Sequence, residues 1–112
     1  MIKKVIFVST LILPMTSISF AGETVSNRKI TDIGCHLTDG TCYVTLSGEP
    51  FGAYENCPSK ITNVFRFNST TVHGRRAYAS FYGAFLAKKN VEVYIDGCYE
   101  TGSPTITYYH VK

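Results

Sequence analysis

An even set of cysteines in a short chain limits what this protein can fold into. The 112-residue chain has four of them, Cys35, Cys42, Cys57 and Cys98. In an oxidising compartment, such a set in a small domain predicts a disulfide framework. A zinc site is the alternative, but no Cys-x-x-Cys pair occurs and the three histidines are scattered without ligand spacing. We therefore expect two disulfides, and neither a metal nor another cofactor.

The first 21 residues indicate where those disulfides form. Lys3 and Lys4 precede a short apolar run, and small residues stand at positions −3 and −1 of a cleavage site after Ala21. This order is typical of a secretory signal peptide, and the apolar run is too short to span a bilayer. We expect residues 1–21 to be removed, leaving residues 22–112 as one secreted or periplasmic domain that is not an integral membrane protein.

The size and charge of the mature domain exclude several function classes. Removing Lys3 and Lys4 with the leader lowers the formal charge from +3 to +1. Binding along a nucleic-acid backbone needs a larger basic footprint, so we expect no nucleic-acid partner. No nucleophile elbow, metalloprotease helix or phosphate-binding glycine run occurs. We therefore predict no catalytic residues and no enzymatic activity.

Spacing chooses among the three pairings that four cysteines allow. Cys35 and Cys42 flank the turn-forming stretch His-Leu-Thr-Asp-Gly-Thr, so a hairpin would bring them within bridging distance. This leaves Cys57 to pair with Cys98. The loop-closure model gives about 4 kcal/mol of stabilisation for the long loop and about 2.5 kcal/mol for the short one. The longer disulfide is expected to matter more for stability.

Hydrophobic patterning predicts strands on both sides of one helix. In the segment 42–46, for example, Cys42, Val44 and Leu46 share one face. The glycine- and proline-containing stretch 47–60 is expected to be a loop with a mobile tip. The expected strands cover 29–37 with a bulge, 42–46, 61–67, 91–95 and 105–111.

The segment 75–89 has the period of an amphipathic helix. Lys88 and Lys89 would lie in its last turn, and Asn90 could take the left-handed position after it. The apolar stripe, expected to face the core, comprises Tyr78, Phe81, Tyr82, Phe85 and Leu86. The opposite face is small, with Ala79, Ser80, Gly83 and Ala87.

This element order, β-β-β-α-β-β, is that of a five-stranded oligonucleotide/oligosaccharide-binding barrel. We therefore predict an α+β fold, mainly β with one helix, in which a closed barrel forms around a bent first strand. Phe65 and Phe67 are expected to fill the core. Tyr43, Tyr94 and Tyr109 alternate with the buried positions and are the candidates for an exposed aromatic surface.

The segment from Ser26 to Gly48 resembles a known family. The run Ser-Asn-Arg-Lys-Ile-Thr-Asp-Ile, then Asp39 and Tyr-Val-Thr-Leu-Ser-Gly, is similar to the start of the receptor-binding B subunits of subtilase cytotoxin and related pertussis-like toxins. A weaker likeness continues through the helix to the Val-Glu-Val-Tyr-Ile strand ending at Ile95.

The resemblance implies a homopentameric ring that binds sialylated host cell-surface glycans and carries an exported enzymatic A subunit. The family's sugar-contacting serine falls at Ser26. Arg28 could pair with a sialic acid carboxylate, and Tyr43 could offer an aromatic surface to the sugar. The small helix face, Ala79, Gly83 and Ala87, would lie at a subunit interface or pore.

A second function remains open from the same residues. A secreted or periplasmic protein-binding domain, such as an inhibitor or adaptor, would use the loop 47–60 against a protein target and would not bind glycans.

Overall fold

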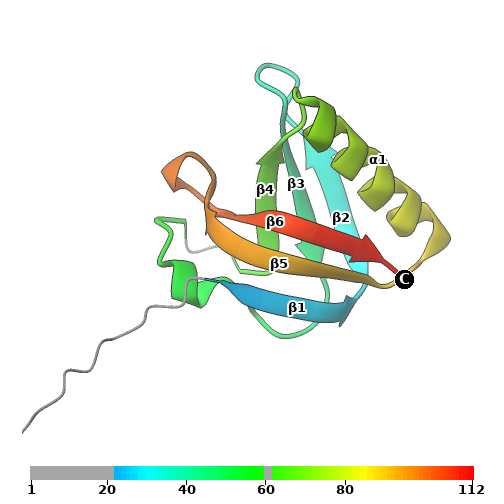
Figure 1. The fold of residues 1–112 in the computed structure, drawn as a ribbon, viewed down its shortest axis with the longest axis horizontal. Coiled ribbons are helices and arrows are strands. Elements are labelled where there is room, and N and C mark those ends of the chain that lie inside the picture. The colour runs from blue at the N-terminus through cyan, green and yellow to red at the C-terminus, as the bar shows by residue number, and fades with distance from the viewer. Residues whose placement is uncertain (1–21, 60–61) are drawn as a thin grey trace, which may run out of the picture.

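The computed structural model describes residues 22–59 and 62–112. The leader expected over residues 1–21 lies outside these ranges. Six strands form two antiparallel sheets, β1-β5-β6 and β2-β3-β4, whose strands cross at a steep angle in Figure 1. One helix, α1, lies along the β2 side of the molecule (Figure 1). The elements are β1 Glu23–Arg28, β2 Ile30–Cys35, β3 Thr41–Leu46, η1 Ala53–Glu55, β4 Val64–Asn68, α1 Val72–Ala87, β5 Val91–Cys98, η2 Tyr99–Thr101 and β6 Pro104–Val111.

The predicted five-stranded closed barrel is wrong, because six strands form two separate sheets in the described part of the chain. The additional strand is β1, which pairs with β5. Asn27 has a φ of 57° and the β1–β5 register shifts beside it. The extended backbone is therefore interrupted near the end of β1, and β1 and β2 are two strands in different sheets instead of one bent strand. Within the described ranges no ladder joins β4 to β6; the Thr105 hydroxyl instead donates to the Arg66 carbonyl at 2.6 Å.

The core lies between the two sheets and α1. The predicted alternation is confirmed on β3, where Cys42, Val44 and Leu46 are buried, and on β5, where every second residue from Val91 to Ile95 is fully buried. Phe65 and Phe67 are also buried, and both rings contact Phe81 of α1 at centroid distances of 5.4 and 5.7 Å.

The helix starts and ends earlier than the sequence predicts. The Thr71 hydroxyl caps its N-terminus by accepting a hydrogen bond from the Gly74 N–H at 2.9 Å. Lys88, not Asn90, takes the left-handed position at its C-terminus, with a φ of 57°. Both ends are therefore fixed by local backbone and hydroxyl bonds that the apolar pattern does not contain.

The predicted buried stripe of α1 is only partly right. Phe81 is buried, but Tyr82 and Leu86 are 45% and 63% exposed. The remaining buried positions are small residues, Gly74, Ala77 and Ala84. A Cβ on Gly74 would lie 1.8 Å from the Asn68 carbonyl oxygen, so this side of α1 is small because it lies against the end of β4.

The two disulfides of the structure, Cys35–Cys42 and Cys57–Cys98, are the pairs that spacing predicts. The longer one ties the loop after β3 to the end of β5. The Glu55 carboxylate ties the same loop, accepting hydrogen bonds from the N–H groups of Gly22 at 2.9 Å and Gly97 at 2.6 Å. The described part of the expected mobile loop is thus bonded to β5 and to the residue before β1.

No helix among the described residues is long and apolar enough to cross a membrane.

Candidate functional site

A polar pocket of about 280 Å³ lies where the β2–β3 turn, β4 and the β5–β6 loop meet. This volume is near the lower end of the range for small-molecule sites. The pocket combines hydroxyls, one guanidinium, two carboxylates and one imidazole. Its lining residues are His36, Asp39, Thr41, Ser59, Arg66, Tyr99, Glu100, Gly102 and Ser103.

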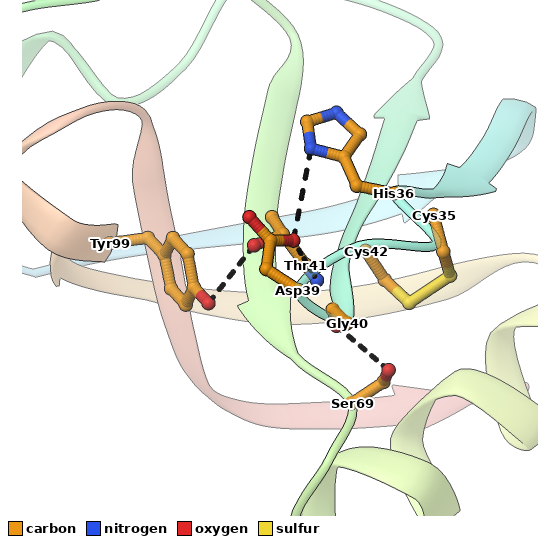
Figure 2. A network of polar contacts seen from close by, with 8 residues as sticks. All are labelled: Cys35, His36, Asp39, Gly40, Thr41, Cys42, Ser69 and Tyr99. Atoms are coloured by element: carbon orange, nitrogen blue, oxygen red, sulfur yellow. Dashed lines mark hydrogen bonds and ion pairs between the residues drawn. A yellow bond between two sulfur atoms is a disulfide. The ribbon is translucent and has the colours of Figure 1, made fainter.

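The β2–β3 turn forms one wall and is held by its own polar groups. The Asp39 carboxylate accepts a hydrogen bond from the Thr41 N–H at 2.9 Å, and this bond is the main reason that the pKa of Asp39 is lowered. His36 Nδ1 lies 4.0 Å from the same carboxylate oxygen. The Cys35–Cys42 disulfide closes the base of the turn (Figure 2).

The same turn is anchored to the segment before α1. Both the N–H and the hydroxyl of Ser69 donate to the Gly40 carbonyl, at 2.9 and 2.8 Å (Figure 2). Gly40 has a φ of +76°, which favours glycine. The wall therefore has a fixed backbone shape independent of any ligand.

Tyr99 forms the opposite wall. Figure 2 shows its hydroxyl directed at Thr41, with the two side-chain oxygens 3.2 Å apart. Thr41 is buried, so this contact satisfies its hydroxyl. Two backbone bonds hold Tyr99 in the β5–β6 loop: its N–H donates to the Ser103 carbonyl at 2.8 Å, and its carbonyl accepts from the Gly102 N–H at 2.7 Å.

Arg66 carries the charge that makes the pocket a candidate binding site. Its Nε is buried and has no hydrogen-bond partner among the described residues. Its guanidinium carbon lies 6.0 Å from the centre of the Tyr43 ring, within cation–π range. No carboxylate in residues 22–59 or 62–112 forms an ion pair with it. The buried Nε is out of a ligand's reach, but an anion in the pocket could pair with the rest of the guanidinium, which is only half-buried.

The three residues predicted to bind glycan do not lie together at this pocket. Tyr43 is next to it, because β3 and β4 pair Tyr43 directly with Arg66. Ser26 and Arg28 lie on β1, in the other sheet. These three positions stay a prediction.

Both β1 residues have partners within the chain. The Ser26 hydroxyl donates to Glu92 at 3.0 Å, and this bond, followed by one from Lys112, lowers the pKa of Glu92. Arg28 donates to the carbonyls of Ser47 and Glu49 at 2.6 and 2.8 Å. A ligand at Ser26 or Arg28 would have to compete with these bonds.

The expected aromatic surface is also arranged differently. Tyr109 turns inward, with its ring 5.0 Å from that of Phe81, whereas its neighbour Tyr108 is 49% exposed. Tyr43 and Tyr94 are half-buried. The period-two pattern assigned the wrong member of the Tyr108–Tyr109 pair to the surface, because a register shift between Ile95 and Tyr94 interrupts the β5–β6 ladder.

The predicted interface residues Ala79, Gly83 and Ala87 are exposed on α1. A Cβ on Gly83 would meet no atom within 4 Å. In the described part of the chain, no group of three or more His, Cys, Asp or Glu side chains is placed to hold a metal ion.

Comparison with protein-family models, with curated proteins and with solved structures finds no match. None of the three links the chain to toxin B subunits, so that resemblance stays a prediction.

Proposed function

We propose that this protein is a secreted glycan-binding module, the B component of a bacterial toxin, and that it holds an acidic sugar such as sialic acid in the polar pocket. The observation that carries the proposal is the Arg66 guanidinium in the pocket lining, which forms no ion pair with a carboxylate of the described residues. A sugar carboxylate is a planar acceptor that fits a guanidinium in two parallel hydrogen bonds.

The rest of the pocket supports the same ligand class. A sialic acid carries one carboxylate and several hydroxyl groups, so its recognition needs one cation surrounded by neutral donors and acceptors. Arg66 supplies the cation, while Tyr99 and Ser103 are among the neutral polar residues around it. The carboxylates of Asp39 and Glu100, also in the lining, repel a negative charge, so a ligand must place its single carboxylate at Arg66 and turn uncharged groups towards them.

Calorimetric titration with sialyllactose tests the site. Arg66→Gln should weaken binding about 10- to 100-fold, the worth of one hydrogen bond to a charged group. Arg76→Gln is the matched control, because Arg76 is an exposed arginine of α1 away from the pocket. Unchanged binding by Arg66→Gln would remove the pocket from the proposal, and a loss on Ser26→Ala alone would place the site at β1.

Assembly into a ring is part of the proposal. Gly83 lies on the exposed face of α1 beside Tyr82 and Leu86, so a second copy could pack closely there. Gly83→Leu should then break the assembly and leave the domain folded. Sedimentation of the native protein as a monomer at micromolar concentration would contradict the ring, and with it the expected enzymatic A subunit.

A protein-binding domain is the second candidate. The loop 47–59 is fixed by the Cys57–Cys98 disulfide and presents Tyr54, which is 76% exposed. Exposed aromatic anchors on preorganised loops are common in protein interfaces. If the native protein binds no glycan, and Tyr54→Ala abolishes capture of an envelope protein, this function replaces the first.

A further inference from the structure

A second cavity adjoins the polar pocket and differs from it in character. It has a volume of about 330 Å³ and lies between β6, the end of β4 and the first turns of α1. Its surface is mostly apolar. Among the side chains that line it are His73, Tyr99, Tyr108 and Tyr109.

Tyr99 separates the two cavities, since it lines both of them. Arg66 lines the polar pocket and the next residue, Phe67, lines the second cavity, so the two cavities lie on opposite sides of β4, an edge strand of its sheet. The bond from the Thr105 hydroxyl to the Arg66 carbonyl holds β6 against β4 at this point. Tyr99 is the residue that the two linings share, so a ligand that occupies both cavities would pass over its ring at the edge of β4.

The tyrosines that line the second cavity have different structural roles. The Tyr109 ring packs on Phe81, and its hydroxyl lies 3.3 Å from that of Ser80, so this residue is part of the core. Tyr108 is 49% exposed, which makes its ring available to a ligand. Tyr99 offers a second ring, and His73 at the start of α1 offers polar nitrogens.

We infer that this cavity is a second subsite, which takes the neighbouring uncharged sugar of the glycan whose acidic sugar occupies the polar pocket; the inference rests on the proposed function. The non-polar face of a neutral sugar ring packs on an aromatic ring, while its hydroxyls reach water or nearby polar groups. An acidic second sugar fits poorly, because no arginine or lysine lines the cavity. The ligand is thus an acidic oligosaccharide of at least two sugars.

Two ligands separate the subsites: the methyl glycoside of sialic acid, and sialyllactose. The native protein should bind sialyllactose at least tenfold more tightly in calorimetric titrations. Tyr108→Ala should remove that tenfold difference and leave the affinity for the methyl glycoside unchanged. Tyr54→Ala is the matched control, because Tyr54 is an exposed tyrosine of the loop 47–59 that belongs to neither cavity lining, and it should change neither affinity.

An NMR experiment on the native protein gives the same information without a substitution. Sialyllactose should shift the amide signals of Thr107 and Tyr108, and the methyl glycoside should not. Equal affinity for the two ligands, or an undiminished preference in a folded Tyr108→Ala variant, would overturn the second subsite and leave the proposed function standing. Failure of the native protein to bind either ligand would overturn both.

Discussion

Two glycines of α1 give opposite expectations for the same substitution. A Cβ on Gly74 would lie 1.8 Å from the Asn68 carbonyl oxygen and 3.0 Å from Cα of Ser69. A Cβ on Gly83 would meet nothing within 4 Å. Gly74→Ala should therefore force α1 away from the end of β4, whereas Gly83→Ala should only add a methyl group that meets no described atom of the same chain.

The magnitudes follow from these distances. A carbon and a carbonyl oxygen rarely approach closer than about 3.3 Å, so Gly74→Ala requires a shift of roughly 1.5 Å between α1 and β4. Such overpacking costs about 1–3 kcal/mol. The shift would also strain the cap bond from the Gly74 N–H to Thr71, worth about 1 kcal/mol. After the gain of about 1 kcal/mol in helix propensity, a loss of about 2 kcal/mol remains.

Gly83→Ala has only the propensity gain, which should raise the free energy of unfolding by about 1 kcal/mol. The two variants should then differ by about 3 kcal/mol. For a domain of this size, that difference separates their melting temperatures by roughly 12–24 °C.

Thermal and urea unfolding, followed by circular dichroism with the disulfides intact, measures both variants against the native protein. A Gly74→Ala variant as stable as the native protein would show that α1 does not lie against the end of β4. A loss of stability in Gly83→Ala would show that another part of the chain, or a second copy packed on α1, covers this position.

Three other expectations concern polar and covalent links between distant parts of the chain. Ser26→Ala should raise the pKa of Glu92 towards its ordinary value, as followed by NMR titration of the carboxyl group. The Ser26–Glu92 bond stabilises the fold only while Glu92 is ionised. The native protein's higher free energy of unfolding relative to Ser26→Ala should therefore disappear as the pH falls through the pKa of Glu92. Glu55→Gln should lower the free energy of unfolding by about 1.5 kcal/mol in urea titrations, because two backbone N–H groups donate to this carboxylate. If the leader is cleaved before Gly22, the nitrogen of Gly22 becomes an α-ammonium group that donates to the Glu55 carboxylate. Glu55→Gln should then lower the free energy of unfolding more in the cleaved protein than in a protein that keeps extra residues before Gly22. Replacing both cysteines of the Cys57–Cys98 disulfide, whose sequence separation is 41, should lower the free energy of unfolding by about 4 kcal/mol. Replacing both cysteines of Cys35–Cys42, whose separation is 7, should lower it by about 2.5 kcal/mol. Equal losses in non-reducing urea titrations would contradict the loop-closure argument.

Sequence pattern located the buried strands well because their side chains alternate strictly. On β3 and β5, every second side chain is apolar and buried, so period and burial agree. The strand β1 has no such signal: in Glu-Thr-Val-Ser-Asn-Arg only Val25 is buried. The position of β1 in the sheet depends on its backbone hydrogen bonds to β5, which the spacing of apolar residues cannot reveal. This is why one strand was missing from the prediction.

The helix illustrates a different limit. Pattern analysis assumes that large apolar side chains face the core, but burial also depends on how closely two backbones approach. Gly74 is buried where α1 lies too close to the end of β4 for a larger side chain, and Ala77 and Ala84 are buried on the same side of the helix as Phe81. Tyr82 and Leu86 then point outwards despite their size.

The candidate site is the least predictable part, because its members come from four separated segments. Alternation with Phe65 and Phe67 already indicates that Arg66 faces away from the core, but not what it faces. Its neighbour Tyr43 follows only from the β3–β4 register, and Tyr99 reaches the pocket from a short loop whose path no local pattern encodes. An arginine between two buried phenylalanines has no distinguishing sequence context. It becomes a binding candidate only when the fold places it in a pocket without an ion-pair partner among the described residues.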